Sequence, residues 1–213
     1  MAEKVEVTAG VEGYDRFIPL FIESCQSLDF HEVCKDFITF LPEVGSNVLD
    51  VGAGAGQNSA ALAKLGFNVI AVEPMQEFID AAKAIYKKDP QYKRIKWLSS
   101  SLPDLECLDE NNSKFDFVLI EGVWHHLDEI EREQAVVKLS SLINKQGKCA
   151  ISLRNGPAGM GSRVFKTDAE YTIDLFKKYG FECILNLENL ASIMPHKEDV
   201  KWSRIVLKKK AEG

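Results

Sequence analysis

Residues 14–41 carry apolar side chains at helical spacing, which predicts helices before the first strand. The apolar positions are Phe17, Leu20, Phe21, Leu28, Val33, Phe37, Ile38 and Leu41. Asp29 with Glu32 three residues later has the spacing of a capping box, so we expect a second helix to begin there. Pro42 and Gly45 are then expected to end it.

From residue 48 onward, short apolar runs typical of buried strands alternate with helical segments. The expected strands are 48–51, 67–73, 95–99, 115–121, 148–153, 181–187 and 201–207. The expected helices are 57–65, 75–88, 128–143 and 167–180, the last capped by Thr167 with Glu170. Strands that alternate with helices form a parallel sheet that is covered on both faces.

The last two expected strands have only a loop between them, too short for a parallel crossover, so they should form an antiparallel pair at one edge. We therefore expect one α/β domain over residues 1–213, with a doubly wound, seven-stranded, mostly parallel sheet. Its parts are an N-terminal helical segment, 1–45, and an α/β core, 46–213.

Composition narrows the classes of function. The chain has 46% hydrophobic and 27% charged residues, which is typical of a globular protein. Its net charge of −6 disfavours nucleic acid as a partner, because phosphate backbones need a clustered basic surface. The sequence shows neither a secretory leader nor an apolar run long enough to span a membrane. Five cysteines without a CxxC pair indicate reduced thiols, a cytoplasmic location and no metal site.

A glycine-rich segment, DVGAGAG at residues 50–56, lies between the first strand and the first helix of the core. Parallel sheets bind ligands beyond the carboxyl ends of their strands, so this loop is a candidate site. The dinucleotide fingerprint GxGxxG fails in both registers, because Gln57 and Ser59 stand where its third glycine is required. A purely structural turn is the alternative.

Glu73 ends the next strand, 19 residues after Gly54. A carboxylate at this place accepts hydrogen bonds from both hydroxyls of a ribose. The alternative is a surface acid at a strand end. Together with the glycine loop, Glu73 indicates a nucleoside-containing ligand.

Four segments resemble the class I S-adenosylmethionine-dependent methyltransferases: VLDVGAGAG, AVEP, SSSLPDL and FDFVLIEGVWHHL, from Val48 onward. That family has a Rossmann-like seven-stranded sheet with an antiparallel C-terminal hairpin, and its N-terminal helices often form a lid. The segments GVWHHL, SLRNGP and VKW (200–202) look like a bacterial subgroup whose acceptor the resemblance does not identify.

The resemblance implies a set of residues that bind S-adenosylmethionine. They are Asp50, Gly52, Ala53, Gly54, Gly56, Asn58, Glu73, Pro74, Met75, Ser100, Ser101, Leu102, Glu121, Gly122 and Val123. Asp50 and the glycine loop would face the methionine part, and Glu73 would hold the ribose. Ser100 and Ser101 stand where many members have an acid that contacts the adenine amine. Glu121 and the two residues after it would line the methyl donor.

Residues for catalysis and for the acceptor are expected after the fourth and fifth strands. His125 and His126 are candidate catalytic residues, although adjacent side chains point to different sides, so both should not serve. The alternative is that His126 packs locally and His125 is solvated. Trp124 either walls an acceptor pocket or fills the core.

Arg154 and Arg163 follow the fifth strand and are expected to clamp an anion on the acceptor, with surface salt bridges as the alternative. Tyr14, from the expected lid, is a further candidate for substrate binding. Members of the family that methylate exocyclic or amide nitrogens often carry an Asn-Pro-Pro-Tyr motif after the fourth strand. This chain has Glu-Gly-Val-Trp there, so the resemblance argues against nucleobase or glutamine methylation by that route.

The resemblance implies methyl transfer from S-adenosylmethionine to a small-molecule acceptor, with S-adenosylhomocysteine as product, and we expect a monomer or a homodimer. Two alternatives stay open: methylation of RNA or protein by the same fold, and noncatalytic binding of S-adenosylmethionine.

Overall fold

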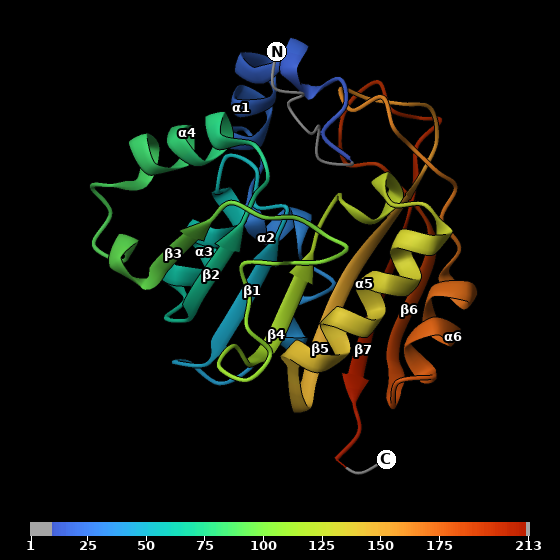
Figure 1. The fold of residues 1–213 in the computed structure, drawn as a ribbon. Coiled ribbons are helices and arrows are strands. Elements are labelled where there is room, and N and C mark those ends of the chain that lie inside the picture. Colours follow the sequence, from blue (N-terminus) through green and yellow to red (C-terminus); the bar gives the residue numbers. More distant parts are fainter. Residues whose placement is uncertain (1–9, 212–213) are drawn as a thin grey trace, which may run out of the picture.

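The computed structural model describes residues 10–211, so the first nine residues of the expected N-terminal segment lie outside the described part. Seven strands form one sheet in the order β3-β2-β1-β4-β5-β7-β6 (Figure 1). They are β1 (Asn47–Val51), β2 (Asn68–Val72), β3 (Ile95–Leu98), β4 (Phe115–Ile120), β5 (Ile143–Asn155), β6 (Phe181–Ala191) and β7 (Lys201–Lys209). β1 to β5 pair in parallel, whereas β7 runs antiparallel to β5 and β6. The predicted fold class is confirmed.

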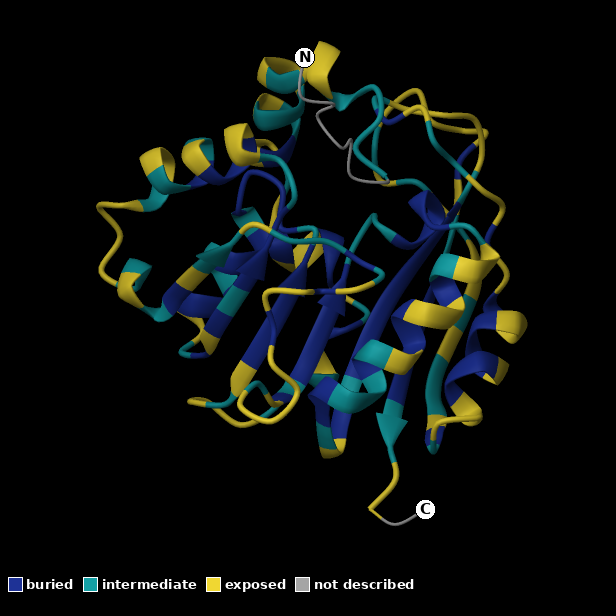
Figure 2. Cartoon of the chain, in the orientation of Figure 1, coloured by how far each residue is buried: buried dark blue, intermediate teal, exposed yellow. Residues whose placement is uncertain are grey.

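Helices cover both faces of this sheet (Figure 1). The core helices are α3 (Gln57–Lys64), α4 (Gln76–Tyr86), α5 (Glu129–Leu142) and α6 (Ala169–Lys177). α5 and α6 pack on one face, and α3 packs on the other with α2 (Phe30–Val33). Figure 2 shows the central strands as almost wholly buried, with exposed positions on the outer sides of the helices.

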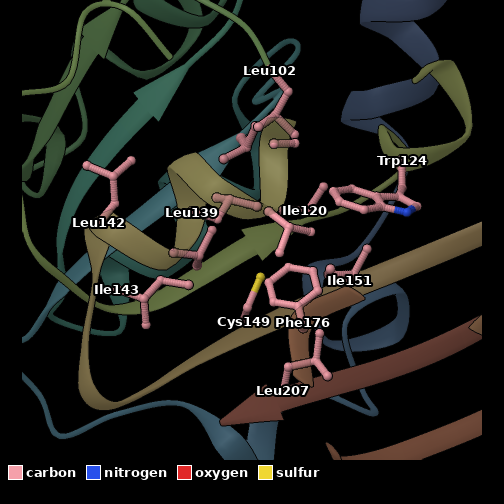
Figure 3. Close-up of a cluster of buried hydrophobic side chains, with 14 of the residues drawn as sticks. Leu102, Ile120, Trp124, Leu139, Leu142, Ile143, Cys149, Ile151, Phe176 and Leu207 are labelled. Carbon is pink, nitrogen blue, oxygen red and sulfur yellow. The ribbon is translucent and has the colours of Figure 1, made fainter. Parts of the chain in front are cut away.

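Successive residues of the central strands enter different cores because strand side chains alternate between faces. In β4, Val118 and Ile120 pack beneath α5 and α6, while Phe117 and Leu119 face α2 and α3. The first of these two cores is drawn in Figure 3. Burial on both faces explains why the strands read as continuous apolar runs.

The N-terminal segment departs from the prediction in the length of its second helix. It contains η1 (Tyr14–Arg16), α1 (Ile18–Gln26), α2 and η2 (Ile38–Phe40). Asp29 caps α2 as expected and accepts from the amides of His31 and Glu32, but α2 ends at Val33. Residues 37–40 are aromatic or β-branched and favour helix weakly. The turns after Val33 let both Cys34 and Phe37 enter the core.

The cap of α6 also differs from the prediction. Asp168, not Thr167, is the N-cap, and its carboxylate accepts from the amide of Tyr171 at 2.8 Å. The Thr167 hydroxyl instead donates to the carbonyl of Arg154, which ties the segment after β5 back onto that strand.

None of the helices between residues 10 and 211 is long and apolar enough to cross a membrane.

Candidate functional site

A cavity of about 260 Å³ lies beyond the carboxyl ends of β1, β2 and β4. The N-terminal helices and the loop between β6 and β7 also line it, so segments from both ends of the chain enclose it. Many predicted site residues line this cavity: Tyr14, Gly52, Ala53, Gly54, Asn58, Glu73, Pro74, Met75, Ser101, Leu102, Glu121, Gly122, Val123 and His126. The residues that do not line it are Asp50, Gly56, Ser100, Trp124, His125, Arg154 and Arg163.

The glycine loop after β1 is pinned to β2. The amides of Gly52 and Ala53 both donate to the carbonyl of Val72, at 2.8 and 3.0 Å. Gly52 has a φ of +70°, and a Cβ there would collide with Val123. Glycine is therefore required for the loop to turn and to pass close to the segment after β4.

Glu73 connects this loop to the start of α4. One carboxylate oxygen accepts from the amide of Gly54 and the other from the amide of Met75, each at 2.9 Å. Only 5% of the residue is exposed, and this burial raises the pKa of Glu73 to about 7. Each oxygen still has a second lone pair, so the carboxylate can accept two further hydrogen bonds from a ligand in the cavity.

Asp50 has a different place from the one expected. It is 1% exposed and accepts a hydrogen bond of 2.6 Å from the hydroxyl of Ser59 on α3. Burial raises the pKa of Asp50 to about 6. The expectation that it faces the methionine part of a cofactor is not met here, because its carboxylate fastens α3 to β1 instead.

Two further residues of the wall, Asn58 and Gly122, leave an acceptor or space for a ligand. Asn58 is buried at the start of α3, and its Oδ1 accepts no hydrogen bond within residues 10–211. Gly122 has a φ of +72°, and a Cβ at this position would point into open space. The wall therefore offers a buried acceptor at Asn58 and open space beside Gly122, whose amide donates to the hydroxyl of Ser152.

A buried ion pair forms part of the cavity wall. Glu121 follows β4, and its Oε2 accepts from Arg204 of β7. The guanidinium of Arg204 also lies over the rings of Phe37 and Trp202, 5.4 Å from each centroid. Burial raises the pKa of Glu121, and Arg204 counteracts this. Sequence reasoning missed Arg204; its only signal was a charged residue beside the buried run Ile205–Leu207.

His126 joins the N-terminal segment to the cavity. Its Nδ1 lies 2.6 Å from the main-chain carbonyl of Arg163, and its Nε2 lies 3.1 Å from the hydroxyl of Tyr14. A carbonyl only accepts, so Nδ1 carries the proton of the neutral ring and Nε2 accepts from Tyr14. Burial lowers the pKa of His126, which keeps the ring neutral at pH 7. Burial also raises the pKa of Tyr14 to about 12.

Two expectations for neighbouring residues are wrong. His125 is 5% exposed and does not line the cavity, and burial lowers its pKa to about 2, so it is neither solvated nor placed for catalysis. Trp124 is fully buried in the core, with its ring 6.2 Å from that of Phe176 (Figure 3). Trp124 therefore does not wall an acceptor pocket.

The two arginines after β5 are placed differently. Arg163 donates to Glu131 at 2.7 Å and to Asp128 at 3.3 Å, and both acids cap α5. Its expected role as an anion clamp is wrong, because these carboxylates already neutralise it. Arg154 donates from Nη2 to the carbonyl of Pro157 at 2.7 Å and forms no ion pair within residues 10–211.

Comparison with known proteins agrees with this architecture. A family model described as a methyltransferase domain matches residues 48–147. An uncharacterized methyltransferase of Bacillus mycoides (strain KBAB4) is 25% identical over 179 residues, which cover 81% of this chain and 74% of that protein.

Two solved structures share the fold. The TehB-like SAM-dependent methyltransferase from Corynebacterium glutamicum superposes with a TM-score of 0.65 at 20% identity, over 92% of this chain and 98% of that one. The 1,6-didemethyltoxoflavin-N1-methyltransferase of Burkholderia thailandensis, with 1,6-didemethyltoxoflavin and S-adenosylhomocysteine bound, has a TM-score of 0.63 at 17% identity, over 97% of this chain and 93% of that one. The matching domain, the strand order and these relatives support the assignment of the chain to the class I S-adenosylmethionine-dependent methyltransferases.

Proposed function

We propose that the protein transfers the methyl group of S-adenosylmethionine to a small-molecule acceptor and releases S-adenosylhomocysteine. The observation that carries this proposal is the convergence of Glu73, Asn58 and Gly122 on one cavity at the carboxyl ends of the strands. In doubly wound sheets this edge is where ligands bind.

The residues present fit the cofactor. Glu73 offers two carboxylate oxygens toward a ribose. Hydrogen bonds from the amides of Gly54 and Met75 already hold these oxygens in place. The buried, unpartnered Oδ1 of Asn58 can accept from an ammonium or hydroxyl donor of the ligand. The open main chain at Gly122 leaves room for a ligand beside β4. A carboxylate at position 73 would repel a phosphorylated ribose, which favours an unphosphorylated nucleoside.

When bound, S-adenosylmethionine supplies a methyl group that a positively charged sulfur activates. The protein then has to align acceptor and methyl group and to exclude water, so positioning provides much of the rate. His126 is the proposed general base for methyl acceptors that lose a proton in the reaction. Its Nε2 carries the lone pair of the neutral ring, which accepts from the Tyr14 hydroxyl until an acceptor displaces that bond, and the carbonyl of Arg163 fixes this tautomer.

The remaining cavity wall suits a small acceptor. Apart from the cofactor residues it includes Tyr14, His126, Trp202 and residues 191–194 at the end of β6 and in the following loop. The N-terminal helices act as the proposed lid: the ring of Tyr14 lies 5.2 Å from Phe21 of α1, and its hydroxyl reaches His126 of the core. A wall built from both chain ends favours a compact acceptor over a segment of RNA or protein.

Titration calorimetry with S-adenosylmethionine, S-adenosylhomocysteine and NAD tests the cofactor. We expect binding of the first two and none of NAD, and tighter binding of NAD would overturn the assignment. The acceptor is then sought by incubating the protein and labelled cofactor with a metabolite extract, followed by mass detection of methylated products. Transfer to RNA or protein alone would contradict the proposed small-molecule acceptor.

A further inference from the structure

Arg154 stands on the cavity side of the sheet. It lies near the carboxyl end of β5, directly opposite Trp202 of β7, and Ser152 two residues earlier lies opposite Arg204. Side chains of opposed residues in antiparallel strands share one face. Trp202 and Arg204 both line the cavity. Arg154 therefore projects from the same face of the sheet, beside Trp202, although it does not itself line the cavity.

The charge of Arg154 has no acidic partner in the described part of the chain. Only 9% of the residue is exposed, and the one hydrogen bond of its side chain in residues 10–211 goes to the neutral carbonyl of Pro157. By contrast, Arg163 and Arg204 are paired with carboxylates. A buried charge without a counter-ion is costly, and a guanidinium has five N–H donors to satisfy.

The positive charge lies close to the residues proposed to meet the acceptor. It contributes to the lowered pKa of His126 and opposes the rise in the pKa of Tyr14. Both of these residues line the cavity. A negative group beside Arg154 would therefore lie next to Tyr14, His126 and Trp202.

We infer that Arg154 binds an anionic group of the methyl acceptor, a carboxylate or a phosphate, and so restricts the acceptors to anionic molecules. Both groups match the planar fork of a guanidinium and can accept two parallel hydrogen bonds from it. This inference rests on the proposed function, because it concerns the acceptor of that same reaction. It also gives the buried guanidinium the counter-ion that the chain does not supply.

The first test separates the inference from the proposed function. A metabolite extract is divided on an anion exchanger at pH 8 into a retained, anionic fraction and a flow-through, and each is incubated with the protein and labelled cofactor. We expect labelled product from the retained fraction. Label in the flow-through alone would overturn the inference and leave the proposed function intact, whereas no label in either fraction would contradict both.

The second test uses variants on the acceptor so found. Arg154→Lys keeps the charge but loses the fork, and we expect its KM for the acceptor to rise about tenfold or more. Arg94→Lys is the matched control, since Arg94 also donates to a main-chain carbonyl, that of Gly66, but precedes β3 at the opposite edge of the sheet. Separate acceptors with a carboxylate and with a phosphate distinguish the two groups.

A purely structural role for Arg154 predicts a different result. Loss of the bond to Pro157 would then lower the melting temperature and the affinity for S-adenosylhomocysteine, and would leave the acceptor KM of the folded protein unchanged. The inference requires the reverse: a raised acceptor KM with cofactor affinity within about twofold of wild type. An unchanged acceptor KM in Arg154→Lys would overturn it.

Discussion

Glu73→Gln changes one oxygen of a buried carboxylate to an amide nitrogen and leaves the side-chain shape intact. In the wild-type protein the two oxygens accept from the amides of Gly54 and Met75. In the variant, the NH₂ group faces one of these donors, and the charge that would strengthen hydrogen bonds from a ribose is lost. The substitution therefore acts on cofactor affinity and on stability through separate physical causes.

The affinity for S-adenosylhomocysteine should fall. Hydrogen bonds to a charged group contribute about 1.5–3 kcal/mol, which corresponds to roughly a ten- to a hundredfold weaker dissociation constant. The structure supports this magnitude because the carboxylate is buried and lines the cavity.

The contribution of Glu73 to the stability of the wild-type protein should decrease as pH rises. Folding raises the pKa of Glu73 from 4.5 to about 7, mainly by desolvation. Between these values the folded protein holds a proton that the unfolded chain has lost, so the stabilising contribution is full below pH 4.5 and is lost as pH rises toward 7. At 1.36 kcal/mol per pKa unit, this loss amounts to about 3 kcal/mol.

Glutamine does not titrate, so the stability of Glu73→Gln relative to wild type should increase by about 2–3 kcal/mol between pH 4.5 and pH 8. Urea unfolding at several pH values measures this, and calorimetry measures the affinity. Glu77→Gln is the matched control, because it makes the same change at an exposed position of α4. A pH-independent stability difference would refute the reasoning from burial, and an unchanged affinity would remove Glu73 from the ribose site.

Three other substitutions probe the site. Tyr14→Phe removes the donor to Nε2 of His126 and should lower the unfolding free energy by about 1 kcal/mol, as measured in urea; no loss would mean that the bond is not formed. Because the pKa of His126 lies below 6.5, the wild-type transfer rate should stay constant from pH 8 down to 6.5, and His126→Asn should be slower throughout; a rate that falls between pH 8 and 6.5 would contradict a neutral ring. Arg204→Met leaves Glu121 buried and unpaired and should cost about 3–5 kcal/mol of unfolding free energy, part of which Glu121→Gln in the same chain should restore; simple additivity would speak against the ion pair.

The fold was predictable because its signals are local. Apolar runs, glycines after strands and the cap at Asp128 each act over a few residues, and the connection between β6 and β7 leaves little choice of direction. The same locality explains the correct placement of Glu73 at the cavity, since a strand end in a parallel sheet fixes where its side chain lies.

The errors concern properties that spacing alone does not determine. Trp124 and His125 follow the same strand end as Gly122, yet a single turn of 3₁₀ helix directs them into the interior. The ion pair of Glu121 with Arg204 joins residues 83 positions apart, and it depends on the strand order that brings β7 near β4. Whether an arginine is paired, as Arg163 is, likewise depends on distant acids.

The Glu121–Arg204 pair has a consequence for recombination between related enzymes. It reaches from the end of β4 to β7 across the intervening strand β5. A chimera that exchanges only the C-terminal hairpin, in order to change the acceptor, would separate the two charges if the incoming hairpin lacks the arginine. The position after β4 and the hairpin should therefore be exchanged together. Crossover points should be chosen so that Glu121 and Arg204 come from the same parent.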